Sequence, residues 1–264
     1  MSELLELARS IAVEAAEFAA ARRDDGVSVA ATKSSVSDIV TQVDRDTEDL
    51  IRSFIAKARP RDGFFGEEGA ATAGESGLTW VVDPIDGTVN FLYDIPQWAV
   101  SIGVVEGEPD PQTWRALAGA VVNPRLGEVY TARDGAGAEL NGRALQAPPA
   151  PPLAESLVAT GFFYDSDTRR RQGAVVAELL PIVRDIRRMG AGSLDIVAVA
   201  TGRVNAYFET NLSPWDHAAA ALITREAGAV VAGKNGRQPD ADRVLAGPRE
   251  LVDWLSIFLD ERGY

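Results

Sequence analysis

Residues 80–91 read WVVDPIDGTVNF and place two carboxylates, Asp83 and Asp86, three positions apart at the end of an apolar run. Short apolar runs of this kind are typical of buried strands, and this one is expected to break at Asp83-Pro84. Because ligand sites favour the carboxyl ends of strands, we expect both carboxylates to face one site. An ordinary Asp-Gly turn with solvated carboxylates explains the short motif equally well, so the rest of the chain must decide.

The two residues after Asp86 are suited to binding a phosphate group. Gly87 permits close approach of the backbone to a ligand, and Thr88 is placed to open a helix. The free N–H groups at the start of a helix can donate hydrogen bonds to anionic oxygens.

The sequence on either side of this run predicts an α+β unit. Apolar residues at helical spacing after Ser2 indicate a long amphipathic helix, and a second helix is expected to follow Asp44 and to stop before Pro60. Three short apolar runs predict strands of a largely antiparallel sheet, at residues 99–105, 118–122 and 128–132.

A proline-dense stretch at residues 147–152 marks the expected boundary between an N-terminal half, residues 1–146, and a C-terminal half, residues 147–264. Strands and helices then alternate, as in α/β proteins. The expected strands are 157–160, 185–188, 204–208 and 229–231, and the expected helices are 168–180, 193–200, 216–227 and one started by Pro248.

The composition of the chain argues against several classes of function. The 264 residues are 46% hydrophobic, enough for a large core, and they contain no apolar run of the roughly 18 residues that a membrane span requires. The N-terminus lacks the pattern of a secretory signal, so we expect a cytoplasmic protein. The 26 basic and 39 acidic side chains give a net charge of −13, which disfavours nucleic acid and anionic membranes as partners.

The chain has no cysteine, and His217 is its only histidine. Thiolate chemistry and multi-histidine zinc sites are therefore excluded. Oxygen-ligated hard cations remain as the natural electrophile for an anionic substrate. His217 follows Asp216 in an expected helix and should face elsewhere, in a packing role.

As a block, residues 80–91 resemble the central signature of the inositol monophosphatase family. Further motifs of that family appear in the same order along nearly the whole chain, at residues 38–44, 66–69 and 215–220. The resemblance implies a layered αβαβα sandwich of two tightly joined halves. It also implies Mg²⁺-dependent, lithium-sensitive hydrolysis of small phosphate monoesters, commonly by a homodimer.

The family pattern further implies a set of metal ligands. Glu67, Asp83 and the carbonyl of Ile85 would hold one Mg²⁺, and Asp83, Asp86 and Asp216 a second, with a third and weaker ion beside Glu67. Carboxylate and carbonyl oxygens are the ligands that Mg²⁺ prefers, and paired ions stabilise both the attacking and the leaving oxygen.

By the same resemblance, Asp44 and Thr88 would form a hydrogen-bonded pair that, with Glu67, orients and deprotonates the attacking water. No covalent phosphoenzyme is expected. The residues implied to bind substrate are Lys33, Asp86, Gly87, Thr88, Gly192, Glu209 and Asp216.

Substrate identity stays open at this point. Glu209 matches a family glutamate that contacts sugar-alcohol hydroxyls, but this chain has Gly192 where relatives often have alanine, and residues 211–214 form an unusual lead-in to Asp216. Inositol 1-phosphate is the first expectation. Histidinol phosphate, a sugar phosphate and a non-catalytic regulatory relative are the alternatives.

Overall fold

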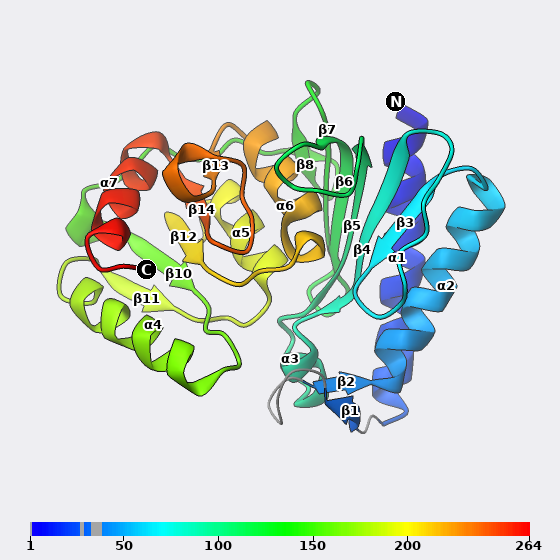
Figure 1. Ribbon diagram of the computed structural model, residues 1–264, viewed down its shortest axis with the longest axis horizontal. Helices are drawn as coiled ribbons and strands as arrows, with labels where there is room; N and C mark the ends of the chain where they lie inside the picture. Colours follow the sequence, from blue (N-terminus) through cyan, green and yellow to red (C-terminus); the bar gives the residue numbers. More distant parts are fainter. Residues whose placement is uncertain (1, 27–28, 33–38) are drawn as a thin grey trace.

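Five layers of alternating helices and sheets make up the computed structural model, which describes residues 2–26, 29–32 and 39–264 (Figure 1). Helices α1 (Ser2–Asp24) and α2 (Gln42–Ala58) cover the outer face of a seven-stranded sheet. Helices α5 (Gly192–Ala200) and α6 (Pro214–Glu226) fill the space between this sheet and a five-stranded sheet. Helices α4 (Ser166–Leu179) and α7 (Arg249–Asp260) cover the far face of the five-stranded sheet, so the predicted αβαβα sandwich is confirmed.

The seven-stranded sheet contains every long strand of the N-terminal half, in the order β3-β4-β5-β6-β7-β8-β9. All neighbours are antiparallel except β3 and β4, as the sequence led us to expect. Its strands are β3 (Gly63–Gly66), β4 (Leu78–Asp86), β5 (Ala99–Glu106), β6 (Arg115–Asn123), β7 (Glu128–Arg133), β8 (Ala138–Leu140) and β9 (Arg143–Ala144). A separate ribbon pairs β1 (Val29–Thr32) with β2 (Ile39–Thr41).

The five-stranded sheet is mixed, in the order β11-β10-β12-β14-β13. The strands are β10 (Leu157–Thr160), β11 (Asp185–Arg187), β12 (Ala206–Glu209), β13 (Val230–Ala232) and β14 (Val244–Gly247). Two 3₁₀ turns, η1 (Leu153–Glu155) and η2 (Lys234–Gly236), lie outside it. No described helix is long and apolar enough to cross a membrane.

Several expected boundaries differ from the structure by a few residues, and two of the differences lie at acidic residues of the sequence motifs. Helix α2 begins before Asp44, because Thr41 is its N-cap and exchanges hydrogen bonds with Asp44 in the first turn. Strand β4 does not break at Asp83-Pro84: its register with β5 shifts there, and pairing resumes between Asp86 and Ala99. A proline at an irregular register position leaves no ladder donor unpaired, so the strand continues.

Small residues set the distance between α6 and the seven-stranded sheet. A Cβ atom placed on Gly119 of β6 would lie 3.0 Å from Cα of Ala219 and 3.1 Å from its carbonyl oxygen. On β5, a Cβ atom on Gly103 would lie 3.0 Å from Cβ of Ala218. The helix backbone therefore rests almost directly on the strands, and the position of Asp216 at its start depends on this packing.

We expect Gly119→Val to lower the free energy of unfolding by about 1–3 kcal/mol, because helix backbone atoms cannot move aside without displacing α6. Urea denaturation measures the effect. Gly173→Ala in α4 is the control: no atom lies within 4 Å of its added methyl, and alanine favours a helix, so this variant should be as stable as wild type or slightly more stable. An unchanged stability for Gly119→Val would contradict the close packing.

Candidate active site

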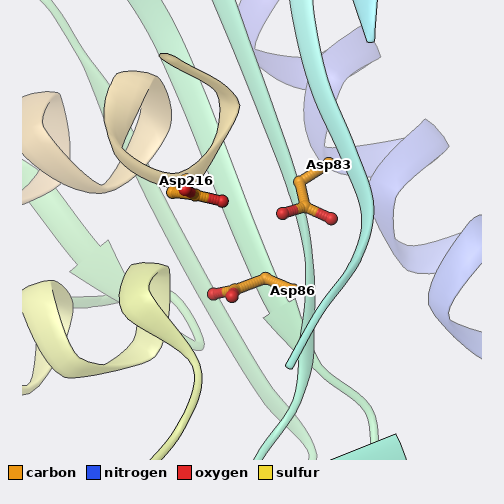
Figure 2. A group of neighbouring side chains, drawn as sticks. All are labelled: Asp83, Asp86 and Asp216. Carbon is orange, nitrogen blue, oxygen red and sulfur yellow. The ribbon is translucent and has the colours of Figure 1, made fainter. Parts of the chain in front are cut away.

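Three carboxylates meet at one place in the fold (Figure 2), those of Asp83 and Asp86 buried and that of Asp216 half-buried. Asp83 and Asp86 stand at the end of β4, and Asp216 stands in the first turn of α6. Each offers an oxygen that lies within 4.8 Å of the others. Residues 130 positions apart in sequence thus form one group, which only the fold can assemble.

Backbone amides fix the direction of each carboxylate. The N–H groups of Gly192 and Ser193, at the start of α5, donate to the two oxygens of Asp86 at 3.1 and 2.7 Å. The N–H of Ser213 donates to Asp216 at 2.7 Å, and the N–H of Ile85 donates to Asp83 at 3.0 Å. The carboxylates are therefore held in place by rigid backbone.

The electrostatics of the three carboxylates favour the binding of a cation. Burial raises the pKa of Asp83 and Asp216 well above the usual range, and mutual repulsion with Glu67 and Asp86 raises both further. Burial also raises the pKa of Asp86, although the hydrogen bonds from Ser193 and Gly192 oppose it. None of the three aspartates forms an ion pair with a described lysine or arginine. An all-oxygen group of this kind fits a hard divalent cation.

Glu67 joins the group from the turn that follows β3 and lines the same cavity. An aromatic contact across the halves supports it: the rings of Phe65 and Trp215 meet edge to face with centroids 5.3 Å apart. Because Trp215 precedes Asp216, this contact brings Glu67 and Asp216 to one cavity.

Asp44 and Thr88 form the pair that the sequence led us to expect. Helix α3 (Thr88–Leu92) starts after Gly87, and the Thr88 hydroxyl lies 3.2 Å from Oδ1 of Asp44 and 3.2 Å from the carbonyl oxygen of Ile85. The other oxygen of Asp44 accepts from the N–H and the hydroxyl of Thr41. Burial raises the pKa of Asp44 to about 6.

The rest of the cavity lining includes further acidic residues, but the described residues contain no second group of three possible metal ligands. Glu209, at the end of β12, accepts a 2.5 Å hydrogen bond from the Tyr207 hydroxyl. Asp195 of α5 is almost fully buried, and its Oδ1 has no hydrogen-bond partner. Burial and the charges of Glu209 and Asp86 hold the pKa of Asp195 well above its usual range.

The cavity has a volume of about 250 Å³, and of the expected site residues it brings together Glu67, Asp83, Ile85, Asp86, Gly87, Thr88, Gly192, Glu209 and Asp216. Asp44 stands behind Thr88. Lys33 lies outside the described residues, so its expected role stays a prediction. A larger hollow of about 720 Å³ lies between α4 and the C-terminal residues. It lacks the three-carboxylate group, so we place the site in the smaller cavity.

Sequence reasoning missed Asp195 and Arg188, which also line the cavity. A signal for Asp195 was present: it is the one charged residue of the otherwise apolar helix α5. Arg188 gave no such signal, because it follows another arginine in a polar stretch. His217 is buried beside Trp114 with its pKa lowered to about 3 by burial, in keeping with the expected packing role.

Known proteins share both the sequence and the fold. A Mycobacterium tuberculosis protein named inositol-1-monophosphatase SuhB is 42% identical over 248 residues, which cover 87% of this chain and 83% of that protein. An Escherichia coli protein named Nus factor SuhB is 34% identical over 267 residues, which cover 99% of this chain and 97% of that protein. The crystal structure of the extragenic suppressor protein suhB from Bartonella henselae superposes with a TM-score of 0.89 at 31% identity, covering 98% of this chain and 99% of that one.

Together with the acidic cavity, these likenesses define the class of the protein, which is a phosphomonoesterase. The family model described as inositol monophosphatase family matches residues 1–256. The chain belongs to the inositol monophosphatase family.

The environment of Glu209 predicts how stability depends on pH. Burial raises its pKa from 4.5 to about 7, against the opposing effects of Tyr207 and Arg188. The folded protein thus binds the proton of the Glu209 carboxyl more tightly than the unfolded chain does. The stability that this adds is fully present below about pH 4.5 and is lost as the pH rises through 7. Glu209→Gln stays neutral and keeps an acceptor for Tyr207.

We therefore expect the stability of wild type, relative to Glu209→Gln, to fall between pH 5 and pH 8. The upper limit for this fall in the free energy of unfolding is about 3 kcal/mol. The expected value is smaller because the carboxylate is partly solvated. Urea denaturation in chelator at both pH values measures it, with the exposed Glu250→Gln as the control for loss of one charge. A difference that is constant with pH would refute the raised pKa.

Proposed function

We propose that this protein hydrolyses inositol 1-phosphate to myo-inositol and phosphate, with Mg²⁺ as cofactor and water as nucleophile. One observation carries the proposal: the carboxylates of Asp83, Asp86 and Asp216, none of them paired with a described lysine or arginine, line a cavity that Glu209 also lines. A cation at the carboxylates suits a phosphate, and a carboxylate elsewhere in the lining suits the hydroxyls of a polyol.

The residues proposed to hold Mg²⁺ are Glu67, Asp83, the carbonyl of Ile85, Asp86 and Asp216, for two ions and a weaker third. When bound, Mg²⁺ would neutralise the phosphate oxygens and make a water molecule more acidic. The role of the chain is to hold these oxygens in a fixed, dry arrangement, and the amide hydrogen bonds to Asp86, Asp216 and Asp83 serve it.

Thr88 and Asp44 are proposed to take up the proton that the attacking water loses. Because one Asp44 oxygen is occupied by Thr41, the other is directed at the Thr88 hydroxyl. When the hydroxyl donates to Asp44, its lone pairs are free to accept a proton from water. A pKa of about 6 for Asp44 suits proton transfer near neutral pH. Glu67, at the cavity wall, is proposed to orient the same water.

Glu209 is proposed to accept hydrogen bonds from two hydroxyls of the inositol ring, with Tyr207 fixing its direction. The amine of histidinol phosphate could pair with the same carboxylate, and a sugar phosphate could donate to it, so both remain alternative substrates. Gly87 and Gly192 are proposed to let the substrate approach the backbone. A regulatory role without catalysis is the less favoured alternative, because no proposed ligand is missing. By resemblance to the family, we also propose a cytoplasmic homodimer.

The test is release of phosphate from inositol 1-phosphate, histidinol phosphate and fructose 1-phosphate at fixed Mg²⁺. We expect inositol 1-phosphate to give the highest kcat/KM, chelator to abolish turnover, and Li⁺ to inhibit it. Asp216→Asn, which removes one charge at similar volume, should be inactive but folded. Turnover that survives in chelator would exclude the metal assignment, and a faster rate on another ester would exclude the inositol assignment.

Thr88→Ala should lower kcat about 10²-fold or more while KM changes little, because the hydroxyl acts on water rather than on the alcohol. Thr88→Ser keeps the hydroxyl and is the matched control, with an activity within about tenfold of wild type. A change confined to KM would move Thr88 from proton transfer to substrate binding.

A further inference from the structure

The turn that carries Glu67 is in contact with a buried carboxylate of helix α2. This turn follows β3, and Phe64 and Thr72 close it by exchanging backbone hydrogen bonds at 2.9 and 2.8 Å. Glu48 of α2, whose side chain is only 3% exposed, accepts a 2.8 Å hydrogen bond from the N–H of Glu68. Because Glu68 is next to Glu67 in the chain, this contact fixes the backbone that presents the proposed metal ligand.

Arg52, one helical turn after Glu48, holds the same carboxylate in place. Its Nη2 lies 3.1 Å from Oε1 of Glu48 and 3.3 Å from the carbonyl oxygen of Ala70, and its Nη1 lies 3.4 Å from the Thr72 hydroxyl. The guanidinium also stacks on the ring of Phe64, with Cζ 3.9 Å from the ring centroid. This pair, the Glu48–Arg52 clamp, therefore contacts the turn at both of its ends and in its middle.

The turn has glycine where the clamp needs space. A Cβ atom on Gly66 would overlap Oε2 of Glu48, and one on Gly69 would lie 2.6 Å from Oε1 of Glu48 and 2.8 Å from Nη2 of Arg52. A larger residue at either position would therefore displace the carboxylate. Burial of a carboxylate is costly and is tolerated only while its charged partner and hydrogen-bond donor stay in place. The clamp therefore favours a single position of the turn, because a shift of Glu68 would leave a buried charge without its donor.

We propose that the Glu48–Arg52 clamp positions Glu67 and thereby sets the affinity of the site for Mg²⁺. Glu48 lies outside the described lining of the cavity, so it acts through the turn and not by contact with the cation. A ligand carboxylate that is held in place in advance loses less freedom when the cation binds, and affinity rises accordingly. The proposal rests on the proposed binding of Mg²⁺ by Glu67 and names the residues that keep this ligand in position.

The test measures the dissociation constant of Mg²⁺ alone, without substrate, by isothermal titration calorimetry. The variant Glu67→Gln identifies the part of the titration that depends on Glu67. In that part, Glu48→Gln and Arg52→Gln should each weaken binding about tenfold, as is typical for residues that orient a metal ligand. Gly69→Ala should weaken it about threefold or more, because the added methyl group displaces the carboxylate of Glu48.

The choice of variants separates positioning from charge and from stability. If charge alone mattered, Glu48→Gln would weaken Mg²⁺ binding and Arg52→Gln would strengthen it, whereas loss of the clamp weakens binding in both. Val252→Ala is the control for stability, because it opens a small cavity in the core under α7, on the far face of the five-stranded sheet. Its affinity for Mg²⁺ should stay within about twofold of wild type.

Three outcomes would overturn the proposal: opposite changes in Glu48→Gln and Arg52→Gln, affinities within about twofold of wild type in both, or an equal loss in Val252→Ala. Circular dichroism at the temperature of the titration shows whether each variant is folded. If a charge variant does not fold, Gly69→Ala decides, because residue 69 is exposed and the change is small.

Failure of the proposed function is distinguishable from failure of this inference. A wild type that binds Mg²⁺ but releases no phosphate from inositol 1-phosphate loses the proposed substrate, while the expected affinities of the variants would still establish the clamp. Normal turnover with unchanged Mg²⁺ affinity in Glu48→Gln and Arg52→Gln would overturn the clamp alone. A wild type that binds no Mg²⁺ would overturn both.

Discussion

Repulsion among Asp83, Asp86 and Asp216 is the constraint on which the rest of the structure depends. Burying a single carboxylate costs several kcal/mol, and here two buried carboxylates and a half-buried one have oxygens within 4.8 Å of one another. The amide hydrogen bonds offset only part of this cost, since the pKa values of all three remain raised. Two of the carboxylates stand at the end of β4 and one in the first turn of α6, so the group exists only when strand and helix are packed together.

The middle layer of the fold makes this arrangement possible. Helix α6 rests on β5 and β6 through glycine and alanine contacts, which leave no room for a larger side chain between the helix and the strands. Helix α5 packs beside α6 and turns its first two amides to Asp86. The site is therefore built from the ends of rigid elements, which hold charges in place better than flexible loops do.

Sequence alone identified the carboxylates of β4 because they are close in the chain and follow an apolar run. Asp216 and Glu67 required the family resemblance, since nothing local distinguishes them from an acid at a helix start or in an exposed turn. The cap formed by Thr41 shifted the start of α2, although the Thr-x-x-Asp spacing was visible. Asp195 was visible as the one charged residue of an apolar helix, but its place in the cavity depends on packing between distant segments, which the sequence does not show.

The carboxylate cluster and Glu209 are separate parts of the cavity lining, which explains why the substrate is harder to infer than the type of reaction. Asp86 is held by the amides of Gly192 and Ser193, so the side chain at position 192 can change without altering that contact. A Cβ atom there would point toward Leu212, 3.3 Å away, and toward the Tyr207 hydroxyl, 3.6 Å away. Alanine in place of Gly192 would thus be tight against Leu212 and in ordinary contact with the Tyr207 hydroxyl, which donates to Glu209, while the amide contacts to Asp86 stay the same. Variation at this turn can thus alter the surroundings of Tyr207 and Glu209 while the carboxylate cluster keeps its geometry.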